Sequence, residues 1–316
     1  MALPALQASA ADAVVARRYL LPLIDLTGFA GQVVPLDRGA SGLLAAATAL
    51  RSQRFERGVL LAPSLSSALL FALGGVRMRR GTATDGRRLL LTDAVEPPPP
   101  AALHRASLYQ QLAIGGAPAA PPVPRIVVDD VLRARWQALA AEHASGAIGL
   151  FPGSNASARR WPAQRFAEVA RRLAGVGHRV VVFGGPAELA LTREVAGTLA
   201  LDLGGRTDLP MLAAGLAACR LVVTNDSGPM HLAAAVGTRV VSIWGAGEPR
   251  ETGPLGPGHQ LLRDEALPCL ACRHNVCPRQ GRGTYLPDAQ RECLALVTVD
   301  AVLAAADTCL RDDGGR

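Results

Sequence analysis

A short polar turn near residue 226 carries side chains that could hold an anionic or sugar-like ligand. The turn, NDSGP at 225–229, follows the β-branched run 221–224 and precedes the Ala-rich run 231–236. Amide N–H groups at the start of a helix attract phosphates, so a helix beginning here would offer an anion site. Asp226 could also orient a ribose, a sugar hydroxyl or the loop itself. The candidate ligand-binding residues of this segment are Asp226, Ser227, Gly228 and His231.

A predicted strand–loop–helix–strand unit positions these residues. Residues 221–224 and 240–244 read as buried strands, and 231–236 as the helix between them. Such a βαβ unit belongs to a parallel sheet, and open α/β sheets bind ligands at the carboxyl ends of their strands. An ordinary turn with a helix N-cap is the alternative interpretation of the same residues.

A second group of candidate residues follows a predicted strand at 147–151. Ser154 and Asn155 lie just past the strand end, where backbone N–H groups can meet a phosphate. Arg159 is permanently charged and can hold a phosphate in a bidentate manner, whereas a surface arginine pair at a helix start is the alternative. Glu188 follows the end of the next predicted strand, where it either contacts a ligand or lies in the first turn of a helix.

Four cysteines in a late loop have the spacing of metal ligands, Cys269-x2-Cys272-x4-Cys277-x15-Cys293. Because Zn²⁺ accepts four thiolates, we interpret the group as a structural zinc site. His274 is a further candidate ligand, and a redox or iron–sulfur role is the alternative.

The first half of the chain offers a separate set of polar residues. Ser64 and Ser67 follow a predicted strand at 57–62, and Arg80 and Arg87 could meet phosphates or carboxylates of a second ligand. A solvated basic face is the alternative interpretation of the arginines.

Predicted strands and helices alternate along both halves, which indicates two doubly wound α/β domains, at 1–130 and 147–316. The net charge of +7 suits an acidic partner, but aromatic residues make up only 4%, too few for base-stacking platforms, so we exclude nucleic acid. We find no apolar window of about 20 residues and no signal-peptide pattern. The composition therefore predicts a cytoplasmic protein without a membrane-spanning helix.

Three segments resemble motifs of family 9 glycosyltransferases, the bacterial ADP-heptose:lipopolysaccharide heptosyltransferases, and are most similar to the heptosyltransferase II type. They are the segment 220–250, the block FPGSNASARRWP at 151–162, and DLGGRTDL at 202–209. The resemblance implies a GT-B fold, in which two Rossmann-like domains face a central cleft. It also implies inverting, metal-independent transfer of a heptose from ADP-L-glycero-D-manno-heptose to the lipopolysaccharide inner core.

The resemblance also assigns roles to the candidate residues. Arg159 would act on the departing diphosphate, and no cofactor is required beyond the structural zinc considered above. The implied partners are the ADP-heptose donor, the lipopolysaccharide core acceptor and the surface of the inner membrane, where we expect a monomeric cytoplasmic protein to bind peripherally. The alternatives are a catalytically silent nucleotide-sugar binding protein and a GT-B transferase for another sugar. The implied donor-binding residues are Ser154, Asn155, Arg159, Glu188, Asp226, Ser227, Gly228 and His231, and the implied acceptor-binding residues are Ser64, Ser67, Arg80 and Arg87.

Members of this family begin with a strand and a Gly-Asp turn whose aspartate is the proposed general base. This chain begins instead at the helix that resembles the next element, at 1–10. Either the start codon is placed too late, or the first domain lacks its first strand and its base. Asp12 is no substitute because it falls after that helix, and Asp85 is the other candidate base. From the resemblance we expect the 316-residue chain to bind the donor but to transfer heptose slowly or not at all.

Overall fold

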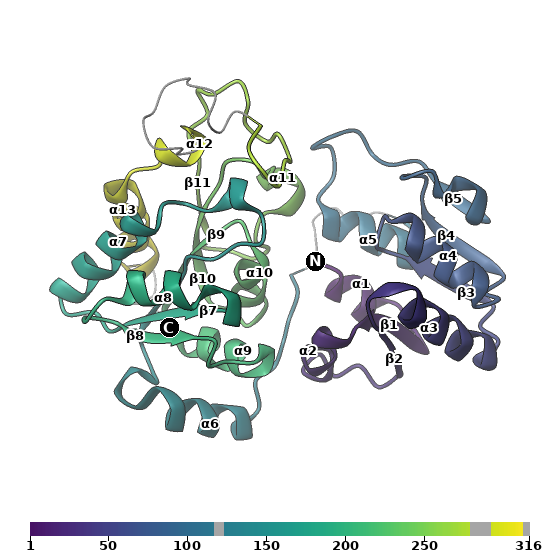
Figure 1. Cartoon of the computed structure of the whole chain (residues 1–316), viewed down its shortest axis with the longest axis horizontal. Coiled ribbons are helices and arrows are strands. Elements are labelled where there is room, and N and C mark those ends of the chain that lie inside the picture. Colours follow the sequence, from purple (N-terminus) through teal and green to yellow (C-terminus); the bar gives the residue numbers. More distant parts are fainter. Residues whose placement is uncertain (117–122, 279–291, 312–316) are drawn as a thin grey trace. The chain divides into compact units, whose positions relative to one another are not determined.

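The computed structural model describes residues 1–116, 123–278 and 292–311. The chain divides into two compact units, Met1–Pro124 and Arg125–Arg316, each of which combines helices with parallel sheets (Figure 1). This α/β architecture confirms the predicted fold class.

A six-stranded parallel sheet forms the centre of the second unit, in the order β11-β10-β9-β6-β7-β8. Ile148, Val182, Val223 and Val241 are completely buried in it, as expected for a sheet covered by helices on both faces. The strands are β6 (Ile148–Phe151), β7 (Val180–Gly184), β8 (Leu201–Gly204), β9 (Leu221–Asn225), β10 (Arg239–Ile243) and β11 (Gln260–Leu262).

Two groups of helices cover this sheet. The first comprises α7 (Ala163–Gly175), α8 (Leu189–Ala196) and α13 (Val299–Arg311), and the second comprises α6 (Asp130–Ala140), α9 (Leu209–Ala218) and α10 (Gly228–Ala235). Helix α7 buries Phe166, Val169 and Leu173 along one stripe while its charged residues face solvent, the pattern of an amphipathic surface helix. Helices α9 and α10 carry no charged residue apart from the histidine at 231 and lie deeper in the core.

The second unit begins at Arg125, so it includes residues 131–146, which we assigned to neither domain, and residues 125–130, which we assigned to the first. Trp136 of α6 stacks on Phe183 of β7 with ring centroids 5.8 Å apart, and its indole N–H donates to the carbonyl of Ala144 at 2.8 Å. The amide of Ile126 donates to the carbonyl of Ala235 at 2.9 Å. These contacts make residues 125–146 part of the second unit.

The first unit contains two separate parallel sheets, one formed by β1 and β2 and the other in the order β3-β4-β5. Each sheet has its own small core, around Val34 and Leu50 in one case and Leu60 and Ala68 in the other. Its strands are β1 (Ala13–Arg17), β2 (Gln32–Leu36), β3 (Arg57–Leu60), β4 (Met78–Thr82) and β5 (Asp93–Val95). Its helices are α1 (Leu3–Ala8), η1 (Arg18–Leu20), α2 (Leu21–Asp25), α3 (Gly39–Gln53), α4 (Leu65–Leu73), η2 (Arg87–Leu90) and α5 (Arg105–Ile114).

Several short elements have no counterpart among the predicted ones. Strands β5 and β11 have only three residues each, too few to show a periodic pattern. The others are η3 (Ala141–His143), η4 (Ser157–Arg159), η5 (Pro186–Glu188), α11 (Pro249–Thr252) and α12 (Glu292–Ala295).

Candidate functional site

The strand order in the sheet of the second unit reverses at β6. Two of the predicted segments lie side by side at this point. From β6 the chain proceeds outward to β7 and β8, and then returns to place β9 on the other side of β6. The register pairs Phe151 at the end of β6 with Thr224 near the end of β9. The loops that follow these two strands therefore emerge together at the carboxyl edge, where open α/β sheets bind ligands.

Asn225, the last residue of β9, connects these two loops. Its side chain is completely buried. Its amide Nδ2 donates to the carbonyl of Pro152 at 2.7 Å, and its Oδ1 accepts the backbone N–H of Trp161 at 2.9 Å. One side chain thus fixes both ends of the loop 152–161. We predicted Asn225 only as a turn residue, although a polar residue ending a buried strand is a usable signal.

Asp226 and Arg159 form an ion pair across the two loops. Asp226 Oδ2 lies 3.2 Å from Arg159 Nη1, with the Asp226 side chain 4% exposed and that of Arg159 28% exposed. Burial raises the pKa of the Asp226 carboxyl, and the charge of Arg159 partly offsets this effect. Because the charged form of this buried carboxylate is poorly solvated, a further hydrogen-bond donor would stabilise it.

Each member of this pair keeps a buried polar atom without a hydrogen-bond partner among the described residues. The atoms are Asp226 Oδ2 and Arg159 Nε, so the ion pair is close but not aligned as a hydrogen bond. Gly247 of the loop after β10 makes room for the carboxylate, because a Cβ at that position would lie 2.0 Å from Asp226 Oδ2. A buried acceptor and a buried donor left unpaired side by side suit a ligand that is both hydroxylated and anionic.

Glu188 also reaches this edge of the sheet, from the loop after β7. Its Oε2 accepts the backbone N–H of Gly185 at 2.8 Å. A Cβ on Gly153 would lie 1.9 Å from Glu188 Oε1, so the carboxylate lies directly against the loop after β6. Ser154 in that loop is buried, and its carbonyl accepts from Arg160 Nε at 2.6 Å, whereas Asn155 is exposed.

The remaining predicted residues of the 226 turn stand at the start of α10. Ser227 precedes the helix, but its hydroxyl does not cap it and lies 3.3 Å from Thr224 Oγ1 instead. Gly228 is exposed, with no atom within 4 Å of the place a Cβ would occupy. His231 is partly buried one turn into the helix. The structure thus brings Ser154, Arg159, Glu188 and Asp226 together at one sheet edge and leaves open space above Gly228.

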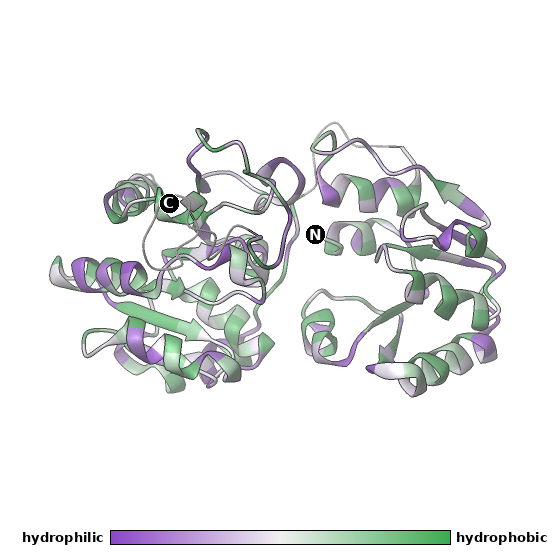
Figure 2. Cartoon of the chain, turned by 45° about the horizontal axis from the view of Figure 1, so that its top comes forward, coloured by the Kyte–Doolittle hydropathy of each residue, from purple (hydrophilic) through white to green (hydrophobic). Residues whose placement is uncertain are grey.

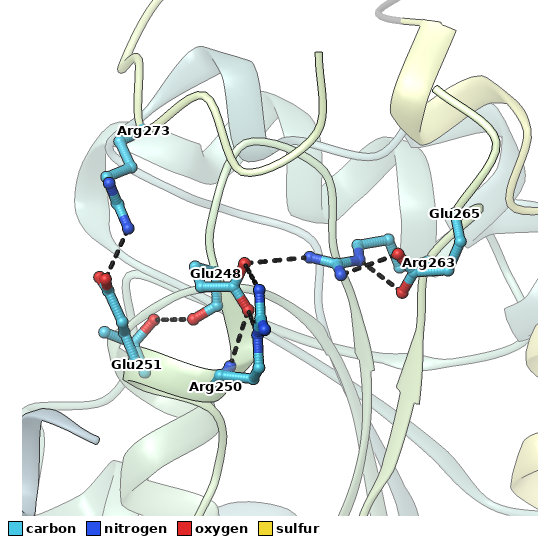
Figure 3. A network of polar contacts seen from close by, with 7 residues as sticks. Glu248, Arg250, Glu251, Arg263, Glu265 and Arg273 are labelled. Carbon is cyan, nitrogen blue, oxygen red and sulfur yellow. Dashed lines mark hydrogen bonds and ion pairs between the residues drawn. The ribbon is translucent and has the colours of Figure 1, made fainter. Parts of the chain in front are cut away.

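A charged network follows β10 and was not anticipated from the sequence (Figure 3). Glu248 is buried and accepts from the backbone N–H and Nε of Arg250 at 3.1 and 3.0 Å, and these bonds hold the pKa of its carboxyl below the usual range. Arg263 Nη1 lies 3.8 Å from Glu248 Oε2 on the other side. Arg273 donates to Glu251 at 2.5 Å, so the network connects α11 to the cysteine-bearing segment.

The four predicted acceptor-side residues differ in burial and in their hydrogen-bond partners. Arg87 is completely buried; its Nε donates to the carbonyl of Thr82 at 2.8 Å and its Nη1 to Ser67 Oγ at 3.0 Å. Burial lowers the pKa of this guanidinium. We therefore correct the prediction that Arg87 contacts a ligand. Its guanidinium instead connects Thr82 at the end of β4 with Ser67 in α4.

The two serines of that set are also engaged within the protein. Ser67 donates to the carbonyl of Ser64, and Ser64 caps helix α4 by accepting the backbone N–H of Ser67 at 3.3 Å. Arg80 pairs with Asp93 at 2.9 Å and keeps a partly exposed side chain. Of the two arginines predicted on the acceptor side, Arg80 is the one whose charge remains at the surface.

The four cysteines approach the turn that ends β10. The amides on either side of Cys272 donate to the carbonyls of Gly245 and Ala246, at 3.1 and 2.7 Å. A Cβ on Gly245 would lie 2.6 Å from Cys293 Sγ. Burial and then the charges of the thiols of Cys269, Cys277 and Cys272 raise the pKa of Cys293 to about 11.

These thiols are free rather than joined in disulfides. Within the described ranges, no three histidine, cysteine or acidic side chains are arranged as ligands of one metal ion, so the zinc site stays a prediction. The structure places the cysteines near one another without forming a tetrahedral ligand set. None of the described helices is long and apolar enough to span a membrane.

Comparisons with known proteins agree with the family resemblance. The model of glycosyltransferase family 9 (heptosyltransferase) matches residues 43–282. Lipopolysaccharide heptosyltransferase 2 of Salmonella typhimurium is 28% identical over 274 residues, which cover 79% of this chain and 78% of that protein. Lipooligosaccharide heptosyltransferase 2 of Haemophilus influenzae is 30% identical over 253 residues, covering 73% and 72%. The solved structure of Escherichia coli ADP-heptose LPS heptosyltransferase II superposes with a TM-score of 0.81 at 24% identity, covering 99% of this chain and 94% of that one.

Proposed function

This chain belongs to glycosyltransferase family 9, and we propose that it transfers a heptose from ADP-L-glycero-D-manno-heptose to the lipopolysaccharide inner core. The relatives that it matches are named as heptosyltransferases of lipopolysaccharide or lipooligosaccharide. The observation in this chain that supports the proposal is the pair Asp226 and Arg159, buried at the reversal point of the sheet with one polar atom unpaired on each.

The two residues suit the two halves of an ADP-sugar. The guanidinium of Arg159 would stabilise the negative charge that develops on the diphosphate as it departs from the anomeric carbon. Asp226 would accept hydrogen bonds from sugar hydroxyls, because its Oδ2 pairs with Arg159 without an aligned hydrogen bond and ionised acceptors form strong hydrogen bonds. The start of α10, open above Gly228, would add backbone N–H groups near the phosphates.

Further details of the reaction are part of the same proposal. A single displacement inverts the anomeric configuration, and Arg159 together with the α10 start can balance the diphosphate charge without a metal ion. Glu188 would contact the nucleoside, since it lies at the same edge of the sheet, two strands away from Asp226 and directly against the loop after β6. We also propose that a monomer works in the cytoplasm, bound peripherally at the inner membrane.

Heptose transfer can be tested with purified protein, ADP-L-glycero-D-manno-heptose and heptose-deficient lipopolysaccharide. The expected result is release of ADP together with a mass increase of one heptose on the acceptor, and even slow transfer yields this product over a long incubation. ADP-heptose binding without any transfer would indicate a nucleotide-sugar binding protein. Transfer of another sugar in preference to heptose would contradict the substrate assignment.

A further inference from the structure

The cysteine-bearing segment, residues 269–277, contacts two loops at the carboxyl edge of the large sheet. Its backbone forms neither helix nor strand. The strands of this unit are hydrophobic (Figure 2), so the polar groups that hold such a segment come from the loops at the strand ends. The hydrogen bonds of the segment identify these loops as the ones that follow β10 and β6.

Two amides of this segment bind the turn that follows β10. The amides on either side of Cys272 donate to the carbonyls of Gly245 and Ala246, at 3.1 and 2.7 Å. The next residue of the turn, Gly247, lies against the carboxylate of Asp226, because a Cβ on it would be 2.0 Å from Asp226 Oδ2. The segment therefore holds the turn against which Asp226 packs.

A carbonyl of the same segment holds the loop that carries Arg159. The carbonyl of Asn275 accepts the backbone N–H of Ala158, the residue directly before Arg159, at 3.0 Å. Asn225 fixes the two ends of this loop, and Asn275 fixes its middle. The cysteine-bearing segment thus contacts both of the structures that support the pair of Arg159 and Asp226.

The side chain of Arg273 fastens the segment to α11 (Figure 3). Its Nη2 donates to Glu251 Oε1 at 2.5 Å, and the side chain of Glu251 is 13% exposed. The backbone N–H of Glu251 donates in turn to the carbonyl of Glu248 at 3.0 Å. Because Glu248 directly follows Gly247, this ion pair connects the segment to the continuation of the turn beside Asp226.

The backbone of the segment is strained at the two residues that donate to the turn. The φ angle is +53° at Ala271 and +60° at Arg273, a left-handed conformation that residues with a Cβ adopt rarely. Such strain persists only where surrounding contacts enforce it, and it is frequent at functional sites. The two amide bonds to the turn and the ion pair with Glu251 are contacts of this kind.

We propose that residues 271–275 clamp the two loops of the donor site together, with Arg273 as a positioning residue for the pair of Arg159 and Asp226. Arg273 acts on the donor only through these loops, by setting the separation between the guanidinium that faces the diphosphate and the carboxylate that faces the sugar. Small displacements of such groups have large effects on binding and rate. The inference rests on the proposed function in that the ligand of the pair is a nucleotide sugar.

Graded variants of Arg273 test this role through donor affinity, measured by calorimetric titration of ADP-L-glycero-D-manno-heptose. Arg273→Ala removes the bond to Glu251 and should weaken donor binding about three- to fivefold, since a partly exposed ion pair contributes little by itself. Arg273→Lys keeps the charge and should restore most of the affinity. Arg273→Pro also removes the amide that binds Ala246 and cannot adopt a positive φ, so it should weaken binding at least about tenfold.

Arg172→Ala is the matched control. Arg172 pairs with Asp300 at 2.6 Å and is 42% exposed, close to the 45% of Arg273, but its ion pair joins α7 to α13. Donor affinity in this variant should equal that of the unaltered protein. An equal loss of affinity in Arg172→Ala and Arg273→Ala would overturn the assignment of Arg273.

A double-mutant cycle separates positioning from a general loss of stability. Since Arg273 acts through the pair, Arg273→Ala should cost less than about twofold in donor affinity when Asp226→Asn is already present. The same loss in both backgrounds would contradict the positioning role, whatever thermal unfolding shows.

Amide hydrogen exchange tests the clamp without a ligand. Exchange in residues 156–160 and 244–248 should be faster in Arg273→Pro than in the unaltered protein, and unchanged in Arg172→Ala. Unchanged exchange of both loops in Arg273→Pro would overturn the proposal.

The two measurements also separate this inference from the proposed function. Heptose transfer with unchanged donor affinity in Arg273→Pro would refute the inference alone. Faster exchange and weaker donor binding in that variant, without heptose transfer by the unaltered protein, would refute the proposed function alone. If the unaltered protein binds no ADP-heptose, the proposed function fails, and the exchange measurement by itself decides whether the clamp exists.

Discussion

The carboxylate of Asp226 lies 3.2 Å from the guanidinium of Arg159, although the two residues are 67 positions apart in the chain and belong to different strand-end loops. The pair occupies the point where the sheet reverses, which is the position expected of a ligand site in an open α/β sheet. Both residues were predicted as donor contacts, but their mutual contact was not.

Replacing Arg159 by alanine should lower kcat more than it weakens ADP binding. Its charge is needed most as the diphosphate departs, so we expect kcat to fall by about a hundred- to a thousandfold. Arg159→Lys should recover part of the rate, because it keeps the charge without the bidentate geometry. Steady-state kinetics and ADP titration calorimetry measure the two effects. Arg171→Ala, which alters an exposed arginine of α7, is the control; an unaltered kcat in Arg159→Ala would remove this residue from the mechanism.

Replacing Asp226 by asparagine should weaken donor binding by about tenfold while leaving the protein at least as stable at neutral pH. Burial raises the folded-state pKa of this carboxyl above its unfolded value. Between those two pKa values the folded state binds more protons, so the stability of the unaltered protein falls as pH rises through that window. The stability advantage of Asp226→Asn should therefore grow across the window and stay constant above it. Urea unfolding over a pH series tests this, and a variant that unfolds far more easily yet binds ADP normally would show that Asp226 is structural.

Replacing Asn225 should affect both the fold and the donor site. Asn225→Ala leaves the carbonyl of Pro152 and the amide of Trp161 without a side-chain partner, at a cost of about 1–3 kcal/mol for each group. We expect a lower free energy of unfolding and a higher KM for the donor, because the loop carrying Arg159 loses its attachment. Asn225→Asp keeps the acceptor for Trp161 and should lose less stability than the alanine variant if the bond to that amide is the more important one. A KM equal to that of the unaltered protein in Asn225→Ala would show that the loop keeps its geometry without this clamp.

The cysteine segment gives a prediction about metal content. If the four thiols hold a structural zinc, the purified protein should contain about one zinc per chain, and chelation should loosen the segment around residues 266–278 without abolishing ADP binding. Elemental analysis and limited proteolysis measure this. Cys272→Ser should lose the metal, whereas Cys219→Ser, which changes a buried cysteine of another element, should keep it. Protein free of metal with four freely reactive thiols would reduce the cysteine spacing to coincidence or to a redox role.

Local patterns were enough to predict most of the elements around the site. The apolar runs before Asp226 and before Ser154 are fully buried strands, and their turn residues follow at the sheet edge as expected. Adjacent strand ends bring these turns together in any parallel sheet of this order. The predicted donor residues are therefore close in space because of a simple topological rule.

The features that sequence reasoning missed depend on long-range contacts. Asn225 acts by reaching Pro152 and Trp161, which lie more than sixty residues earlier, and no local pattern encodes that contact. We predicted Arg87 as a ligand contact because guanidinium groups bind phosphates and carboxylates. Its donors are instead taken by the carbonyl of Thr82 and by Ser67, which only the folded structure reveals.

The most direct test of the donor site is calorimetric titration of ADP-L-glycero-D-manno-heptose into the purified protein and its Asp226→Asn, Arg159→Ala and Arg171→Ala variants. We expect binding of one donor per chain, weakened in the first two variants and unchanged in the third. Equal affinity in all four proteins, or binding of UDP-glucose as tightly as of the ADP-heptose, would contradict it.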